Sequence, residues 1–280
     1  MPLSVMVAAL PACESPTMAG GACGKGKGKD SAKRELMSKR IAECERKASA
    51  MSSKGCFVNA IEAVEENILL RARMGGESGQ QLVCMLQSVA YLCNAYAVES
   101  ISRGDSRQAK ELIDKAIGLT RKRLLKKCKV TELVRVGLRA ATFNTAAFMH
   151  WSIEKGSNGA GNYTCAFRFL QRSLRAVRKH RSGLEVVEAA TLTNMAALLI
   201  MRGSVGDAVT VTSASIDLLN TLCPETQAAW DREFTSPTLG CSGRCARLTA
   251  VWGIYAVTEL NRGVAHEECG NDSSAEESYR

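Results

Sequence analysis

Residues 90–120 carry the sequence AYLCNAYAVESISRGDSRQAKELIDKAIGLT. In its second half, apolar or small residues recur at three- and four-residue intervals, at Ala109, Leu112, Ile113, Ala116 and Ile117. This spacing places them on one face of an α-helix. Gly104 separates that helix from the one before it, and glycine closes helices because it adopts the left-handed conformation without strain. The segment therefore predicts two amphipathic helices joined by a tight turn.

The spacing of that glycine and the alanine five residues later occurs four times. Each glycine stands between two helical patterns, and a small residue five positions on lets the second helix pack closely on the first. The four pairs are Gly55 with Ala60, Gly104 with Ala109, Gly161 with Ala166, and Gly203 with Ala208. We interpret this as an internal repeat of helical hairpins.

The repeated unit resembles the tetratricopeptide repeat, which has a small residue seven before the turn glycine and alanines five and twelve after it. Residues 90–120 match with Ala97, Gly104, Ala109 and Ala116. Residues 189–219 match with Ala196, Gly203 and Ala208, but Ser215 stands at the last small position. The resemblance covers about residues 41–263 and implies an all-α fold, an α-α superhelix of about four to five hairpins. An irregular helical bundle is the alternative.

The match is degenerate in several places. Successive alanines of the motif are 49, 57 and 42 residues apart, against roughly 34 in the ordinary repeat. Asn67 replaces the third small residue of the first unit. A fifth first helix is predicted from Thr249 to Gly263, with no second half after it. We expect a disordered basic leader over residues 1–30, repeats over 31–265 and a flexible acidic tail over 266–280.

Composition supports a helical protein. The 280 residues are 46% hydrophobic and carry a net charge of +9, and the five prolines lie at positions 2, 11, 16, 224 and 237. A span from 17 to 223 without proline makes a turn-rich β-sandwich or barrel improbable. The sequence contains no run of 18 or more apolar residues, so no membrane-spanning helix is predicted. Most of the 12 cysteines lie in helical patterns, which favours reduced thiols in the cytoplasm or nucleus over a secreted disulfide scaffold.

No pattern of catalytic residues is recognisable, so we expect a non-enzymatic protein. The segment GACGKGK, Gly21 to Lys27, has phosphate-loop spacing, but Gly28 occupies the position of the Ser or Thr that holds magnesium. A zinc site from Cys241, Cys245, His266 and Cys269 is conceivable, but no second close pair follows Cys245. We therefore predict no metal and no cofactor.

Two basic clusters are candidate binding surfaces. The first, RKRLLKKCK, contains Arg121, Lys122, Arg123, Lys126, Lys127 and Lys129, and the second, RSLRAVRKHR, contains Arg172, Arg175, Arg178, Lys179 and Arg181. Solvated helix ends, favoured by the helix dipole, are the simplest interpretation. The alternative is a ridge that meets nucleic acid, anionic lipid or an acidic peptide. Aromatic residues do not interleave with these charges in the sequence, which favours an acidic protein partner.

Three asparagines of predicted first helices are candidate peptide-binding residues, namely Asn94, Asn144 and Asn194. In tetratricopeptide proteins the first helices line the concave groove, where an asparagine commonly holds a peptide backbone. An amide both donates and accepts, so it can pair with any main chain. Local pairing between helices is an equal alternative. The leading hypothesis is a scaffold or adaptor that binds protein segments, and the second is a helical-repeat protein that binds RNA through its basic helix ends.

Overall fold

The computed structural model describes residues 28–74, 79–121, 132–153, 160–180, 183–222 and 243–280. The predicted all-α class is confirmed, since the regular secondary structure of these residues is helical. Their helices are α1 (Gly28–Ser53), α2 (Phe57–Arg73), α3 (Gly79–Ser102), α4 (Ser106–Leu119), α6 (Glu132–Ile153), α7 (Ala160–Arg178), α8 (Glu185–Met201), α9 (Val205–Leu222), α11 (Gly243–Glu268) and α12 (Asp272–Tyr279). None of these helices combines the length and the apolar character needed to cross a bilayer.

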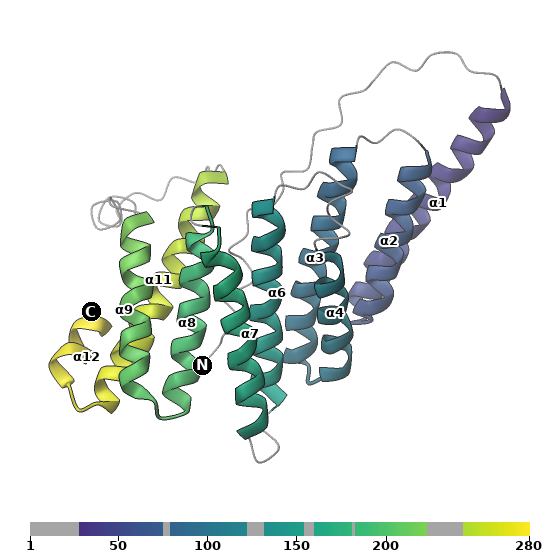
Figure 1. The fold of residues 1–280 in the computed structure, drawn as a ribbon. Helices are drawn as coiled ribbons and strands as arrows, with labels where there is room; N and C mark the ends of the chain where they lie inside the picture. The colour runs from purple at the N-terminus through teal and green to yellow at the C-terminus, as the bar shows by residue number, and fades with distance from the viewer. Residues whose placement is uncertain (1–27, 75–78, 122–131, 154–159, 181–182, 223–242) are drawn as a thin grey trace. The chain divides into compact units, whose positions relative to one another are not determined.

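Two compact units divide the chain between Leu138 and Arg139. In the N-terminal unit, α1 packs on α2, α3 packs on α4, and α2 packs on α3. In the C-terminal unit, α8 packs on α7, α9 and α11, while α11 also packs on α9 and α12 (Figure 1). Helices adjacent in the sequence are therefore the ones that pair, as the hairpin interpretation predicts for α1–α2, α3–α4 and α8–α9.

One turn geometry joins four of these helix pairs. Gly55, Gly104, Gly203 and Gly270 all have φ between 71° and 79°. In each turn the glycine N–H donates to a carbonyl three residues back, and the next N–H donates to a carbonyl five residues back. This is the pattern that satisfies the last carbonyl groups of a helix at a left-handed residue. The recurring glycine thus marks a recurring structure.

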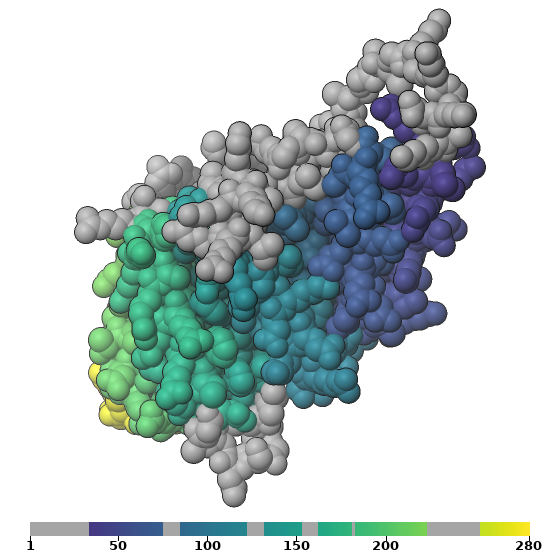
Figure 2. All heavy atoms as spheres, turned by 45° about the vertical axis from the view of Figure 1, so that its right-hand side comes forward, coloured from purple at the N-terminus to yellow at the C-terminus, as the bar shows by residue number. Residues whose placement is uncertain are grey.

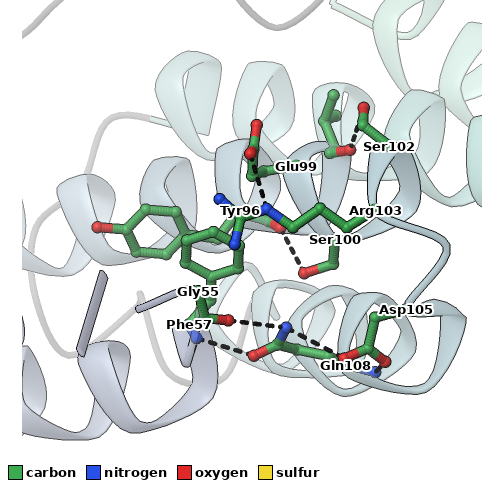
Figure 3. A network of polar contacts seen from close by, with 10 residues as sticks. Gly55, Phe57, Tyr96, Glu99, Ser100, Ser102, Arg103, Asp105 and Gln108 are labelled. Atoms are coloured by element: carbon green, nitrogen blue, oxygen red, sulfur yellow. Dashed lines mark hydrogen bonds and ion pairs between the residues drawn. The ribbon is translucent and has the colours of Figure 1, made fainter. Parts of the chain in front are cut away.

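In the N-terminal unit, Gln108 joins two of these turns. Its Oε1 accepts from the Phe57 N–H at 2.8 Å, and its Nε2 donates to the Gly55 carbonyl at 3.2 Å and to the Asp105 carboxylate (Figure 3). Arg103 lies over the ring of Phe57, which stacks on Tyr96. The start of α2 is therefore fixed against the turn between α3 and α4.

Small residues occupy the closest approaches between helices. The alanines of the repeated motif, Ala60, Ala97, Ala109, Ala116, Ala166, Ala196 and Ala208, are all fully buried. In the C-terminal unit, Leu199, Ala208 and Ala265 join α8, α9 and α11 in one apolar cluster. Figure 2 shows the atoms of residues 139–280 from teal through green to yellow.

The chain end differs from the expected flexible tail. Residues 266–268 complete α11, and α12 packs on α11 with Ala275 and Ser278 buried. Gly270 and Ala275 repeat the glycine–alanine spacing, and Gly263 is the small residue seven before the turn. The fifth hairpin therefore turns at Gly270, seven residues later than the sequence pattern suggested. Gly161 also differs from expectation, since it lies in the first turn of α7 and not between two helices.

Candidate functional site: the basic face of helix α7

Helix α7 presents cations along one side over three turns. Arg168, Arg172, Arg175 and Arg178 are exposed, as is Lys179 directly after the helix. Their spacing of three and four residues aligns them on one face. The helix contains no Asp or Glu. We call the side chains of Arg168, Arg172, Arg175 and Lys179 the α7 basic face.

The opposite side of α7 anchors the helix in the core. Ala166, Leu170, Ser173 and Val177 are buried, and the first two join Ala147 of α6 and Leu198 of α8 in one cluster. Because α7 is held along its whole length, the arginines on its other side are presented at fixed positions. Figure 2 shows this part of the chain, in teal and green, as part of the surface turned to the reader.

Aromatic rings of α6 and α7 support two of the arginines. The Arg172 guanidinium lies over the Phe169 ring, 5.6 Å from its centroid, and Arg139 of α6 lies 5.4 Å from that of Phe143. The two rings pack on each other, and His150 stacks on Phe169 at 5.4 Å. A guanidinium held against a ring loses less conformational freedom when it binds an anion. Arginines and aromatic residues that are separated in the sequence are thus interleaved in space.

Ion pairing distinguishes α7 from α4, another helix with several cations. On α4, Arg107 pairs with Glu111, Lys110 with Asp114, and Lys115 with Glu65 of α2. On α7, Arg178 pairs with Glu188 of α8 at 2.7 Å. Within the described part of the chain, no ion pair involves Arg168, Arg172, Arg175 or Lys179. The charge of the α7 basic face is therefore available to an anionic partner.

The helix dipole accounts for only part of this face. Its effect falls off within the last turn, where Arg175 and Arg178 lie. Arg168 and Arg172 lie further from the helix end, so the dipole gives no reason for them. The helix dipole therefore applies to Arg175 and Arg178 at the helix end, and not to Arg168 and Arg172.

The remaining basic residues are less informative. Arg121 is exposed just after α4. Five of the predicted residues, Lys122, Arg123, Lys126, Lys127 and Lys129, lie outside the described residues, as does Arg181. The structure thus places four residues of the second cluster together on α7 or directly after it, namely Arg172, Arg175, Arg178 and Lys179, and Arg168 extends them.

The candidate peptide-binding asparagines lie between helices. Asn144 and Asn194 are only 8% and 9% exposed. Nδ2 of Asn194 donates to Oδ1 of Asn144 at 2.8 Å, and Nδ2 of Asn144 lies within 3.1 Å of Ser173 Oγ and Thr191 Oγ1. Asn94 is buried as well. The structure thus places Asn144 and Asn194 in local pairing, and a peptide would have to break these bonds to reach them.

Sequence reasoning missed a fourth member of this asparagine series. Asn261 of α11 lies two residues before Gly263, as Asn194 lies two before Ala196. Its Nδ2 donates to the Thr193 carbonyl of α8 at 3.2 Å. The predicted fifth first helix ends at Gly263, so Gly263 was assigned to the turn and not to the small position seven residues before it. For this reason Asn261 was not recognised as a member of the series. The amides of Asn194 and Asn261 thus join α8 to α6 and α11 to α8.

The third small position of the motif has a polar role where it departs from alanine. Ser173 Oγ donates to the Ala140 carbonyl at 3.2 Å, and Ser215 Oγ to the Ala189 carbonyl at 3.1 Å. Asn67 approaches the Ile41 carbonyl in the same way, at 3.5 Å. In each case the second helix of a pair donates to a carbonyl of the first. These departures from the motif therefore bind the two helices together.

Burial shifts the pKa of two described titratable groups. Burial raises the pKa of the Cys93 thiol to about 12, which makes it unreactive at neutral pH. Burial also raises the pKa of the Glu259 carboxyl, against the opposing effects of Arg262 and Tyr255. No group of three or more potential metal ligands occurs in the described residues. Cys241 lies outside them, and His266 and Cys269 lie at the end of α11.

The α7 basic face is therefore the surface whose geometry and charge best fit a ligand. No disulfide bond forms among five described cysteines, which are free thiols: Cys44, Cys56, Cys93, Cys165 and Cys269. Comparison with known protein families and with curated proteins gives no match to this chain.

Proposed function

We propose that this chain is a non-enzymatic scaffold or adaptor of the cytoplasm or nucleus, built as a tetratricopeptide-like superhelix, and that its α7 basic face docks an acidic segment of a partner protein. The observation that carries the proposal is the α7 basic face, whose cations are exposed and take part in no ion pair within the residues that the structure describes. Exposed like charges on one helix face, with no ion pair among the described residues, add no ion-pair stabilisation to the fold itself.

The spacing of the face suits a chain of carboxylates. Residues four apart on a helix are separated by about 6 Å along its axis, which is the separation of Arg168 from Arg172. Alternate side chains of an extended segment are separated by about 6.6 Å. Arginine also binds carboxylates through two parallel hydrogen bonds. An acidic segment can therefore meet several cations without large distortion.

An RNA strand is the second candidate, because phosphates also bind arginine. Single-stranded nucleic acid gains much of its affinity from bases that stack on open aromatic rings. On the described surface the exposed aromatic side chains are Tyr91 and Tyr279, and neither lies on α7. Phe169 is covered by Arg172 and His150. These features favour a protein partner.

Charge reversal on α7 tests the proposal. The probe is a dye-labelled poly-glutamate peptide, followed by fluorescence anisotropy with the full chain. We expect R168E/R175E to weaken binding about tenfold or more. A close charge pair at an interface contributes a coupling energy of about 1.5 kcal/mol or more, and about 1.4 kcal/mol corresponds to a tenfold change in affinity. The matched control is R107E/K110E on α4, which changes the net charge equally but alters cations that already have acidic partners.

Equal losses in both double variants would reduce the effect to net charge and overturn the α7 assignment. A labelled poly-uridine strand provides the other comparison. If the RNA binds and loses affinity in R168E/R175E while the peptide does not bind, the second candidate replaces the first. Thermal unfolding followed by circular dichroism checks that both variants fold, as expected for exposed residues.

A further inference from the structure

The C-terminal end of the chain is as acidic as α7 is basic. Between residues 266 and 280 the sequence has five acidic residues and one arginine. Glu267, Glu268, Asp272, Glu276 and Glu277 are all exposed at the end of α11 and on α12. We call these five residues the acidic end.

The acidic end is held in place on α11. The Tyr279 ring packs on Gly263, and its hydroxyl donates to Glu267 at 2.8 Å. Arg262 donates to Ser278 Oγ at 3.0 Å and also pairs with Glu259. Because α12 is fixed by these contacts, its carboxylates are presented at set positions and lose little freedom when they bind.

The two faces match in charge and in spacing. Asp272 and Glu276 are four residues apart on α12, as Arg168 and Arg172 are on α7. The same rise of about 6 Å separates the members of each pair. Glu276 pairs with the exposed Arg280, a contact that it would exchange for an arginine of α7. Two helices laid side by side can then bring two carboxylates against two guanidinium groups in register.

Within one chain the two faces cannot meet. In the C-terminal unit, α7 packs on α8, while α12 packs on α11. Figure 1 shows α8, α9 and α11 between α7 and α12. Any pairing of these faces therefore requires two molecules.

We propose, resting on the docking role of the α7 basic face given above, that its occupant is the acidic end of a second copy of this chain. The contact joins two different surfaces, so each copy keeps one free face of each kind. Such head-to-tail contacts build open-ended oligomers unless the rotation closes a ring. Self-association and the binding of another acidic partner then compete for the same arginines.

Sedimentation velocity of the full chain tests this proposal. We expect oligomers that grow with protein concentration at about 0.01 M salt and dissociate at about 1 M, because the Debye length falls from about 30 Å to about 3 Å. Two variants each remove one face, namely R168E/R175E and E268K/E276K. We chose Glu268 because a lysine at the end of α11 is favoured by the helix dipole, so folding is preserved.

Each variant alone is expected to sediment as a monomer at both salt concentrations. For the mixture, the two faces are neutralised instead, as R168Q/R175Q and E268Q/E276Q, because reversed charges on the two chains would attract each other. Their equimolar mixture retains one intact face of each kind and is expected to form a one-to-one dimer that grows no further. A monomeric wild-type chain at low salt, or association that persists in R168E/R175E, would overturn the proposal. Self-association of E268K/E276K in the absence of the other variant would also overturn the proposal.

The poly-glutamate peptide separates this proposal from the one it rests on. E268K/E276K retains the α7 basic face, so it should bind the peptide at least as well as the wild-type chain. Peptide binding without self-association leaves the proposed function standing and refutes the second copy as occupant. Self-association without peptide binding refutes the docking of other acidic segments, and absence of both refutes both.

Discussion

The side-chain amide of Asn194 in α8 donates to the side-chain oxygen of Asn144 in α6 at 2.8 Å. The two residues are 50 positions apart in the sequence. Both groups are shielded from water, and Asn144 is in turn bonded to the Ala140 carbonyl, Ser173 and Thr191. A buried amide that loses its hydrogen-bond partner destabilises the fold, because it has also lost its hydrogen bonds to water. This pair therefore stabilises the packing of α8 against α6.

Replacing Asn194 with alanine is expected to lower the free energy of unfolding by about 1–3 kcal/mol, because Oδ1 of Asn144 loses its donor. Urea denaturation followed by circular dichroism measures the change. The matched control is Asn220→Ala on the exposed side of α9, where a change within about 0.5 kcal/mol is expected. Equal stability of the two variants, with weaker peptide binding by Asn194→Ala, would return this residue to a peptide-binding role.

Replacing Gly263 with alanine is expected to loosen α12. A Cβ at this position would come within 2.7 Å of Tyr279 Cδ1 and 2.8 Å of its Cζ, so the ring must move and give up its bond to Glu267. Limited proteolysis with mass spectrometry should then detect faster cleavage after residue 268. Gly206→Ala on α9 is the control, since a Cβ there meets nothing within 4 Å and alanine favours the helix. Unchanged proteolysis in Gly263→Ala would contradict the docking of α12.

Alkylation of the native chain should discriminate among its cysteines. Cys56 and Cys269 are exposed, whereas the Cys93 thiol is buried with its pKa raised to about 12 from 9.0. That rise lowers the thiolate fraction near pH 8 about a thousandfold, and the thiolate is the reactive form. Peptide mapping after iodoacetamide treatment should find Cys56 and Cys269 modified and Cys93 intact. Cys93 should react once the chain is unfolded in urea, and its rapid modification without urea would refute its burial.

The hairpins that were predictable share strong local signals. A glycine with positive φ between two periodic helices is visible in the sequence, because few other residues adopt that conformation. Gly55, Gly104 and Gly203 were identified in this way, and their φ values are 76°, 79° and 77°. The α6–α7 pair lacks this signal, and its motif glycine, Gly161, lies inside a helix instead.

The candidate site was only partly predictable. Exposed arginines follow from helical periodicity, so the cluster around Arg175 could be identified. Whether a cation has an acidic partner depends on neighbouring helices, as the pairing of Arg178 with Glu188 shows. The rings beneath Arg172 and Arg139 could not be inferred either, because they are brought together by the packing of α6 on α7.

The amides that join successive first helices also limit how such an array can change in length. Asn194 meets the side chain of Asn144, but Asn261 meets the backbone carbonyl of Thr193. Each junction thus has its own donor and acceptor, unlike arrays whose units are interchangeable. Duplicating or deleting the α8–α9 pair would set a buried amide against the wrong partner at a new junction. The order of these helix pairs is therefore part of what the sequence encodes.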